Sequence, residues 1–512
     1  MKNILNKPEL FLTVAALFLY LINLGNVALR DWDEGYYATV GRDMYWSNNW
    51  LYPSYLGEPF LLKPPLLFWL INISYHFGGV NDLTSRLPAS LLSGLAVPLI
   101  YCLAREILPQ KRMALWSAIV YLTLLPLVRH DRLAMLDGIT NTFLIFSLFT
   151  LVKGKQKKPW LFGVGLGLGM IALTKGALVL LFILILLVFL IWDRQLKILL
   201  NPYFIAGIII GFAPACIWYI LQYLHYGQTF IDVHFASQVV DRVTKNFEGH
   251  QQPIWYYFLE LVKYSVPWLL FLPGSILYAK DSLDKSWAKL GLIGFVLYLS
   301  MVSLMQSKLP WYIIPLYPFI SLLVGAYLET FARNSPKKAT KVISLLLYLL
   351  SFLTIVGLIY LLIKGLQIYL IILAIVLSIA FGFAAKKLKD NPVQSIVLLA
   401  GGMYLGLTLL MFSSSWLWEL KEAFPVKPVA QLILNNTPAK EIIYSSFAYN
   451  RPSLDYYSQH KVEVQEISVL KKIVESDTIS YLLVTPSVLK ELNLYKGSEL
   501  GIAEGFILWK TK

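Results

Sequence analysis

The stretch ALVLLFILILLVFLIW, Ala177 to Trp192, contains no charged residue and consists almost entirely of Leu, Ile, Val and Phe. A bilayer core of about 30 Å needs roughly 20 apolar residues per helix, and a helix satisfies its backbone polar groups within the segment. Similar apolar stretches, separated by charges, Pro or Gly, recur along most of the chain. The sequence therefore predicts a mainly α-helical polytopic membrane protein.

Composition supports this prediction, since 57% of the 512 residues are hydrophobic and 14% are charged, with a mean hydropathy of +0.62. These values exclude a typical soluble enzyme and a disordered chain. Dividing the chain at the interruptions predicts thirteen spans. They cover residues 9–28, 87–104, 113–128, 138–153, 160–174, 177–192, 203–224, 261–279, 287–306, 309–329, 342–363, 366–385 and 393–412.

The net charge of +14 belongs to the membrane part. Residues 415–512 hold eleven basic and eleven acidic side chains, so the first 414 residues carry the whole excess. Twenty-one of their 33 basic residues fall in one set of alternate loops, which the positive-inside rule places in the cytoplasm. We therefore expect a cytoplasmic N-terminus in an inner membrane and no nucleic-acid partner.

The chain is predicted to have two domains, a membrane domain over 1–414 and a small α/β domain over 415–512. Strand-like runs at 441–444 and 480–484 and helical runs at 429–434 and 467–474 predict the second domain. With thirteen spans this domain lies on the periplasmic or extracellular side. The predicted outer loops, where most ionisable motifs fall, are 29–86, 129–137 and 225–260.

The first outer loop begins with an acidic pair, Asp33 and Glu34. Tyr36, Val40 and Met44 then recur every four residues, which predicts a helix along the membrane surface. The ordinary alternative for the two acids is stabilisation of the first helical turn.

Two basic residues follow in this loop. Lys63 precedes Pro64-Pro65, which begins an apolar helix of about 13 residues, too short to span and therefore interfacial. Arg86 stands at the start of the next span. Either cation can simply neutralise lipid headgroups.

The second outer loop has five ionisable side chains in nine residues, Arg132 and Asp137 among them. Polar groups concentrated at a span's end usually face a protein cavity. Lys175 and Lys308 lie in further tight outer turns.

The third outer loop holds Glu248 and His250, followed by the aromatic run 255–258. Mixed polar and aromatic side chains suit a sugar. Glu248 and His250 lack the spacing of a metal motif, and we expect no metal ligand set and no required cofactor.

In chain order these motifs resemble those of the bacterial GT-C glycosyltransferases, in the branch of the aminoarabinose transferases and protein mannosyltransferases (glycosyltransferase families 39 and 83). The resemblance covers roughly residues 10–330. It rests on Trp32-Asp33-Glu34-Gly35-x-Tyr37-Ala38, Lys63-Pro64-Pro65-Leu66, Ser85-Arg86-Leu87-Pro88, Met135-Leu136-Asp137-Gly138, Thr174-Lys175-Gly176, Glu248-Gly249-His250 and Ser307-Lys308-Leu309-Pro310-x-Tyr312.

The resemblance implies a membrane glycosyltransferase, hexosyl or pentosyl, that inverts the anomeric carbon. It would move a sugar from a polyprenyl-phosphate carrier to lipid A, another envelope glycolipid or a protein on the outer face. Its partners would be this donor, the acceptor and the surrounding lipids.

Residue roles follow from the same resemblance and from the chemistry. A carboxylate must orient and deprotonate the acceptor, and cations must neutralise the leaving phosphate. The expected catalytic residues are Asp33, Glu34 and Asp137; the expected phosphate-binding residues are Lys63, Arg86, Arg132 and Lys308; the expected substrate-binding residues are Tyr37, Lys175, Glu248, His250 and Tyr312.

The chain departs from the aminoarabinose transferases at two positions. Tyr36 stands where they typically carry a basic residue, and Leu62 stands where they carry an acidic one. The sugar therefore stays open. A transporter is the alternative function, although it would require ionisable or helix-breaking residues near the middle of the bilayer. A non-catalytic scaffold would not need the dense charges at 129–137.

Overall fold

The computed structural model describes residues 7–241, 252–365, 367–417, 424–476, 478–493 and 497–511. It is mainly helical and contains two compact units. Unit 1 comprises Met1–Leu24, Leu61–Leu66 and Leu87–Trp416, whereas unit 2 comprises Gly25–Phe60, Leu67–Arg86 and Leu417–Lys512. The predicted C-terminal domain is thus grouped with most of the first outer loop.

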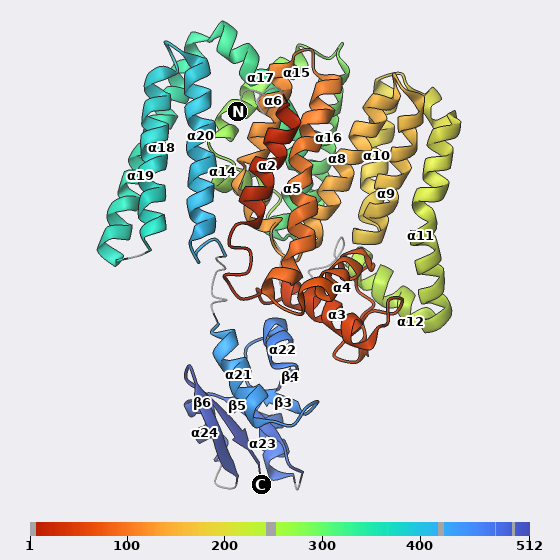
Figure 1. Cartoon of the computed structure of the whole chain (residues 1–512), viewed down its shortest axis with the longest axis vertical. Helices are drawn as coiled ribbons and strands as arrows, with labels where there is room; N and C mark the ends of the chain where they lie inside the picture. Colours follow the sequence, from red (N-terminus) through yellow and green to blue (C-terminus); the bar gives the residue numbers. More distant parts are fainter. Residues whose placement is uncertain are drawn as a thin grey trace. The chain divides into compact units, whose positions relative to one another are not determined.

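Unit 1 is built from apolar helices, labelled in Figure 1. Within the described residues, eight helices are long and apolar enough to cross a membrane. A ninth span results if the bent pair of α14 (Tyr256–Tyr264) and Trp268–Lys280 counts as one. The eight are α5 (Asp82–Ile107), α8 (Leu136–Gly154), α11 (Pro202–Tyr226), α16 (Ser286–Leu304), η5 with α17 (Pro310–Asn334), α18 (Lys337–Lys364), α19 (Ile368–Lys387) and α20 (Pro392–Phe412).

Shorter helices complete unit 1 and explain where the predicted spans break. Pro126 lacks an N–H and separates α6 from α7 inside the predicted span 113–128, and Pro267 separates α14 from the next helix. Each of the thirteen predicted stretches contains helix, although the first is helical only as far as Leu21, and the number of crossings stays a prediction. The shorter helices are α2 (Pro8–Leu21), α6 (Lys111–Leu122), α7 (Leu125–His130), η1 (Lys158–Leu161), α9 (Phe162–Lys175), α10 (Leu178–Trp192), η2 (Leu196–Leu200), α12 (Gln228–Ile231), η3 (Asp232–Asp241), η4 (Trp268–Phe271) and α15 (Leu272–Lys280).

Glycines allow α9 and α11 to pack backbone to backbone. A Cβ on Gly165 would meet the backbone of Gly207, and one on Gly169 would meet that of Gly211. Small residues four apart on both helices are a common packing device in membranes, where close approach replaces the hydrophobic effect. This contact orients α9, the helix that ends at Lys175.

Unit 2 combines loop helices with an α/β fold. Its first-loop part contains α3 (Asp33–Ser47), the short pair β1 (Ser54–Tyr55) and β2 (Glu58–Pro59), and α4 (Leu66–Gly78). Both α3 and α4 were predicted. The C-terminal part contains α21 (Val426–Asn436), β3 (Ile442–Ser445), α22 (Pro452–Ser458), β4 (Lys461–Val464), α23 (Ile467–Glu475), β5 (Tyr481–Val484), α24 (Pro486–Glu491), β6 (Ser498–Ala503) and β7 (Phe506–Lys510).

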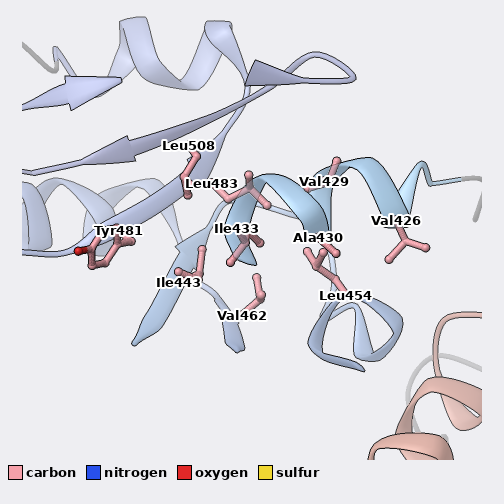
Figure 2. Close-up of a cluster of buried hydrophobic side chains, with 10 residues drawn as sticks. All are labelled: Val426, Val429, Ala430, Ile433, Ile443, Leu454, Val462, Tyr481, Leu483 and Leu508. Carbon is pink, nitrogen blue, oxygen red and sulfur yellow. The ribbon is translucent and has the colours of Figure 1, made fainter. Parts of the chain in front are cut away.

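The C-terminal sheet has the strand order β4-β3-β5-β7-β6, with β4, β3 and β5 parallel and the last two pairings antiparallel. Because side chains alternate along a strand, Leu483 faces α21 whereas Leu482 faces Leu470 on α23. Figure 2 shows the first of these two cores, formed by α21, Leu454 of α22 and the sheet. The predicted α/β class is therefore confirmed.

We expect Gly169→Leu to destabilise the protein, because the new side chain would overlap the backbone of α11. Overpacking of this kind typically costs about 1–3 kcal/mol. The matched control is Gly401→Leu on α20, where a Cβ meets nothing within 4 Å. Thermal unfolding in detergent should show a lower midpoint for the first variant only. Equal midpoints for the two variants would contradict the close packing of α9 on α11.

Candidate functional site

The centre of the polar cluster in unit 1 is Asp137, in the first turn of α8 and only 2% exposed. Lys175, the last residue of α9, forms an ion pair with its Oδ1, and His130 Nε2 lies 3.3 Å from its Oδ2. The Lys175 ammonium also lies 5.8 Å from the centre of the Tyr312 ring, and Trp311 stacks on His130 at 5.5 Å. A buried carboxylate needs such partners, so these side chains form one fixed group.

The turn that carries Lys63 lies beside this group. His234 Nδ1 is 2.8 Å from the carbonyl oxygen of Leu61, and a Cβ on Gly176 would lie 3.7 Å from Pro64 Cγ. Burial lowers the pKa of His234 to about 4, and the nearby Lys63 charge adds to this effect. The imidazole is therefore neutral at physiological pH, while half-buried Lys63 supplies a positive charge to this turn.

A second acid, Asp131, follows α7 and is also 2% exposed. Within the described part of the chain, neither carboxylate oxygen has a hydrogen-bond partner. Burial and the Asp137 charge raise the pKa of Asp131 well above its usual range, against a smaller opposite effect of Lys175. Burial therefore disfavours the charged form of Asp131, whereas the ion pair with Lys175 stabilises the charge of Asp137.

The other two predicted phosphate ligands of unit 1 are buried and bound to carbonyl oxygens. Arg132 donates to Leu19 O at 3.2 Å and to Ile22 O, the carbonyls that end α2, and its guanidinium stacks on Trp416. Lys308 is 5% exposed and donates to Gln252 O at 2.9 Å; burial lowers the pKa of its ammonium. These contacts stabilise the loops that hold the cluster.

Asp33, in unit 2, is the first residue of α3. It is half-buried, and among the described residues its carboxylate has neither a hydrogen bond nor an ion pair. The preceding residue, Trp32, has φ 65° and ψ −130°, a backbone conformation that residues other than glycine rarely adopt. Strain of this kind, about 1–3 kcal/mol, persists where the surroundings hold it and is common at functional sites.

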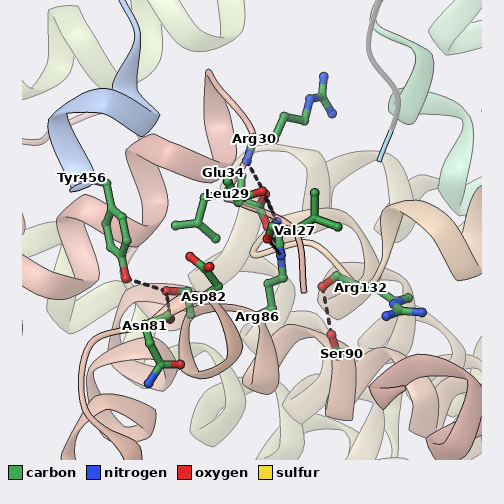
Figure 3. A network of polar contacts seen from close by, with 12 residues as sticks. Val27, Leu29, Arg30, Glu34, Asn81, Asp82, Arg86, Ser90, Arg132 and Tyr456 are labelled. Carbon is green, nitrogen blue, oxygen red and sulfur yellow. Dashed lines mark hydrogen bonds and ion pairs between the residues drawn. The ribbon is translucent and has the colours of Figure 1, made fainter. Parts of the chain in front are cut away.

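Glu34 lies next to Asp33 but is fully buried and paired with Arg86 (Figure 3). Arg86 donates to both carboxylate oxygens at 2.7 and 2.9 Å, and Glu34 also accepts the N–H of Arg30 at 2.7 Å. The guanidinium also donates to two backbone carbonyls, Val27 O at 2.7 Å and Ala28 O at 2.9 Å. We therefore assign Glu34 and Arg86 to holding α3 on the start of α5, in place of the catalytic and phosphate-binding roles expected for them.

Three predicted substrate-binding residues remain: Tyr37, Glu248 and His250. Tyr37 is 3% exposed and packs on Phe68, which makes it part of the α3–α4 core. Glu248 and His250 lie outside the described residues. Among the described residues, no group of three or more His, Cys, Asp or Glu could hold a metal ion.

Comparisons with known proteins give a consistent assignment. A family described as dolichyl-phosphate-mannose-protein mannosyltransferase matches residues 62–219. The fold matches the crystal structure of ArnT from Cupriavidus metallidurans bound to undecaprenyl phosphate, with a TM-score of 0.80, 17% identity and coverage of 98% of this chain and 97% of that one. The chain therefore has the GT-C fold of the ArnT structure. The match includes both the apolar helices and the small C-terminal sheet.

Two curated relatives are undecaprenyl phosphate-alpha-4-amino-4-deoxy-L-arabinose arabinosyl transferases 2 of Pseudomonas fluorescens. The protein of strain Pf-5 is 29% identical over 358 residues, 68% of this chain and 61% of its own length. That of strain Pf0-1 is 30% identical over 359 residues, 68% of this chain and 64% of its own length. This GT-C chain therefore spans less than two thirds of the length of these relatives.

Sequence reasoning missed three residues of the unit 1 cluster. His130 and Asp131 were counted in the dense loop 129–137 but were given no role, although their neighbour Asp137 was selected. His234 was overlooked because it stands alone among apolar residues, between Val233 and Phe235. A buried, isolated histidine gives no spacing signal, so only the fold brings it to the Lys63 turn.

We predict that Glu34→Ala destabilises the protein by about 3–5 kcal/mol, because it leaves Arg86 buried without its counter-charge. Glu58→Ala, an exposed acid on β2 of the same unit, should have no measurable effect. Thermal unfolding in detergent measures both. A Glu34→Ala protein with a wild-type midpoint but greatly reduced turnover would instead support direct catalysis by Glu34.

Proposed function

We propose that this protein is a glycosyltransferase that moves a sugar from a polyprenyl-phosphate carrier to an acceptor, with inversion at the anomeric carbon. The observation that carries the proposal is the state of Asp33. Three acids lie in or just before the first turn of α3. Asp31 is bound to Arg451 and Glu34 to Arg86, while Asp33 has no partner among the described residues. The relatives named as undecaprenyl-phosphate aminoarabinosyl transferases support the choice of donor.

In the proposed step an acceptor oxygen attacks the anomeric carbon as the bond from that carbon to the phosphate oxygen breaks. Asp33 orients the acceptor hydroxyl and accepts its proton, and the polyprenyl phosphate leaves with the bonding electron pair. If the acceptor is itself an anionic phosphate, no proton is transferred and Asp33 only positions it.

The leaving phosphate gains negative charge, so cations must stabilise it. Lys63 and Lys175 are the predicted cations with partly exposed side chains, whereas Arg86, Arg132 and Lys308 are buried. We assign Lys63 to the phosphate. Lys175 and its partner Asp137 keep the adjoining surface of unit 1 in place, since their charges compensate each other.

We propose that the reaction takes place on the outer face of a bacterial inner membrane, with the N-terminus cytoplasmic and the C-terminal domain outside, as the distribution of basic loops predicts. The charged residues of unit 1 also favour transfer over transport. Asp137 lies in the first turn of α8 and Lys175 at the end of α9, not near the middle of a span as a transporter would require.

The experiment compares two donor sugars. The names of the relatives contain an aminopentose, and the family description contains mannose. Purified protein in vesicles is offered polyprenyl phosphate carrying 4-amino-4-deoxyarabinose or mannose, with a glycolipid or a peptide as acceptor. Mass spectrometry of the products identifies the donor sugar and whether a lipid or a protein accepts it. We expect a lipid acceptor.

We predict that Asp33→Asn reduces turnover at least about 100-fold, within the range for a lost general base. The folded state should keep its stability, because the Asp33 carboxylate has no partner among the described residues to lose. Glu58→Gln on β2 is the control and should retain wild-type turnover. Transfer by Asp33→Asn at a near-normal rate would reject the assignment.

We also predict that excess EDTA leaves turnover unchanged within about twofold, because the proposed step uses no Lewis acid. The physical reason is Leu62, an apolar side chain where the aminoarabinose transferases carry an acid before Lys-Pro. Activity that EDTA abolishes and a divalent metal restores would show that this prediction is wrong.

A further inference from the structure

Unit 2 contains a direct connection between the C-terminal domain and Asp31, which lies two residues before α3. Arg451 precedes α22 and donates from Nη1 to Asp31 Oδ2 at 2.5 Å; Ser453 donates to Asp31 Oδ1 through its hydroxyl and, at 3.4 Å, through its N–H. Asp31 is buried, so its negative charge depends on these donors. The chain between the partners is more than 400 residues long, so this contact is purely tertiary.

The backbone of α3 rests on the same segment. A Cβ on Gly35 would lie 2.5 Å from Ser453 N and 2.7 Å from the carbonyl carbon of Pro452, so only glycine permits this approach. About two turns further along α3, Arg42 donates to the carbonyl oxygens of Asp455 and Tyr456 at 3.2 and 2.6 Å. The helix is thus held at two levels by α22.

The strained residue before Asp33 is held from the same side. The Trp32 ring stacks on Tyr449 with centroids 5.1 Å apart and planes 23° apart. Arg451 itself is fixed by aromatic rings, with its guanidinium 4.1 Å from the centroid of Phe424 and 4.7 Å from that of Tyr449. Stacked arginines with a carboxylate partner have little rotational freedom left.

We propose that residues 449–453 of the C-terminal domain form a positioning element for the Asp33 carboxylate, with Arg451 as its central residue. This inference rests on the proposed function and assigns a role to a domain that contributes no catalytic group to it. Arg451 acts through Asp31 and Trp32: it holds the residues on the amino side of Asp33, while the Glu34–Arg86 pair holds those on the other side. Asp33 can then remain unpaired and still have a defined direction.

The test uses the full-length protein in nanodiscs with Arg451→Met, Asp31→Asn, the double variant and Arg451→Lys. The matched control is Lys461→Met, which removes an exposed ion pair with Glu463 on β4 of the same domain. Two readouts are taken: hydrogen exchange of a peptide covering residues 30–40, and kcat and donor KM for sugar transfer. Exchange at β5 reports whether the domain itself stays folded.

Arg451→Met should speed hydrogen exchange in the first turn of α3 at least about tenfold and leave exchange at β5 unchanged. The Lys461→Met control should exchange like the wild type at both places. It should lower kcat about tenfold or more, since small misplacements of a reacting group are costly, with donor KM within about twofold. Arg451→Lys should recover part of kcat. The double variant should be no slower than Arg451→Met, because both substitutions break one contact.

Two results would overturn the proposal. One is that the first turn of α3 exchanges at the wild-type rate in Arg451→Met. The other is that the kcat losses of the two single variants multiply in the double variant. The exchange readout does not depend on the reaction. If wild-type protein transfers no sugar from any polyprenyl-phosphate donor, the proposed function fails, and the exchange result still decides whether 449–453 positions the start of α3.

Discussion

The buried ion pair between Glu34 and Arg86 determines what the start of α3 can do. Two charges taken out of water are tolerable only when each satisfies the other, and here the remaining donors also reach backbone carbonyls. The pair joins α3 to the first turn of α5, so the rotation of α3 is fixed. With Glu34 turned into the protein and Asp31 bound to Arg451, the intervening Asp33 is the acid that has no partner among the described residues.

The same physical rule arranges unit 1. Three of its ionisable groups stand at helix ends. Asp137 pairs with Lys175, Arg132 binds the carbonyls that end α2, and burial raises the pKa of Asp131. The glycine contact between α9 and α11 supports this arrangement, since α9 ends at Lys175. Lys63 is partly exposed. It lies on a turn that neutral His234 holds through the carbonyl oxygen of Leu61.

Local sequence was a good guide where the physics is local. Apolar length predicted the helices, Pro64-Pro65 predicted the start of α4, and the four-residue spacing after Asp33 predicted α3. In the C-terminal domain two strands and two helices were predicted, whereas β4, β6 and β7 were missed. Charges at Lys461 and Glu463 interrupt the apolar pattern of β4, and Gly501 lies at a register shift in β6. The roles of Glu34 and Arg86 could not be predicted, because their pairing joins residues 52 positions apart and looks like a catalytic motif in the sequence.

The central claim is that Asp33 touches the acceptor during sugar transfer. The most direct test is a cryo-EM structure of the full chain with an unreactive polyprenyl-phosphate sugar analogue and the acceptor bound. The account predicts an Asp33 carboxylate oxygen about 3 Å from the attacking acceptor oxygen, or one water away. A complex in which the acceptor oxygen meets a different carboxylate, with Asp33 outside the substrate cleft, would contradict it.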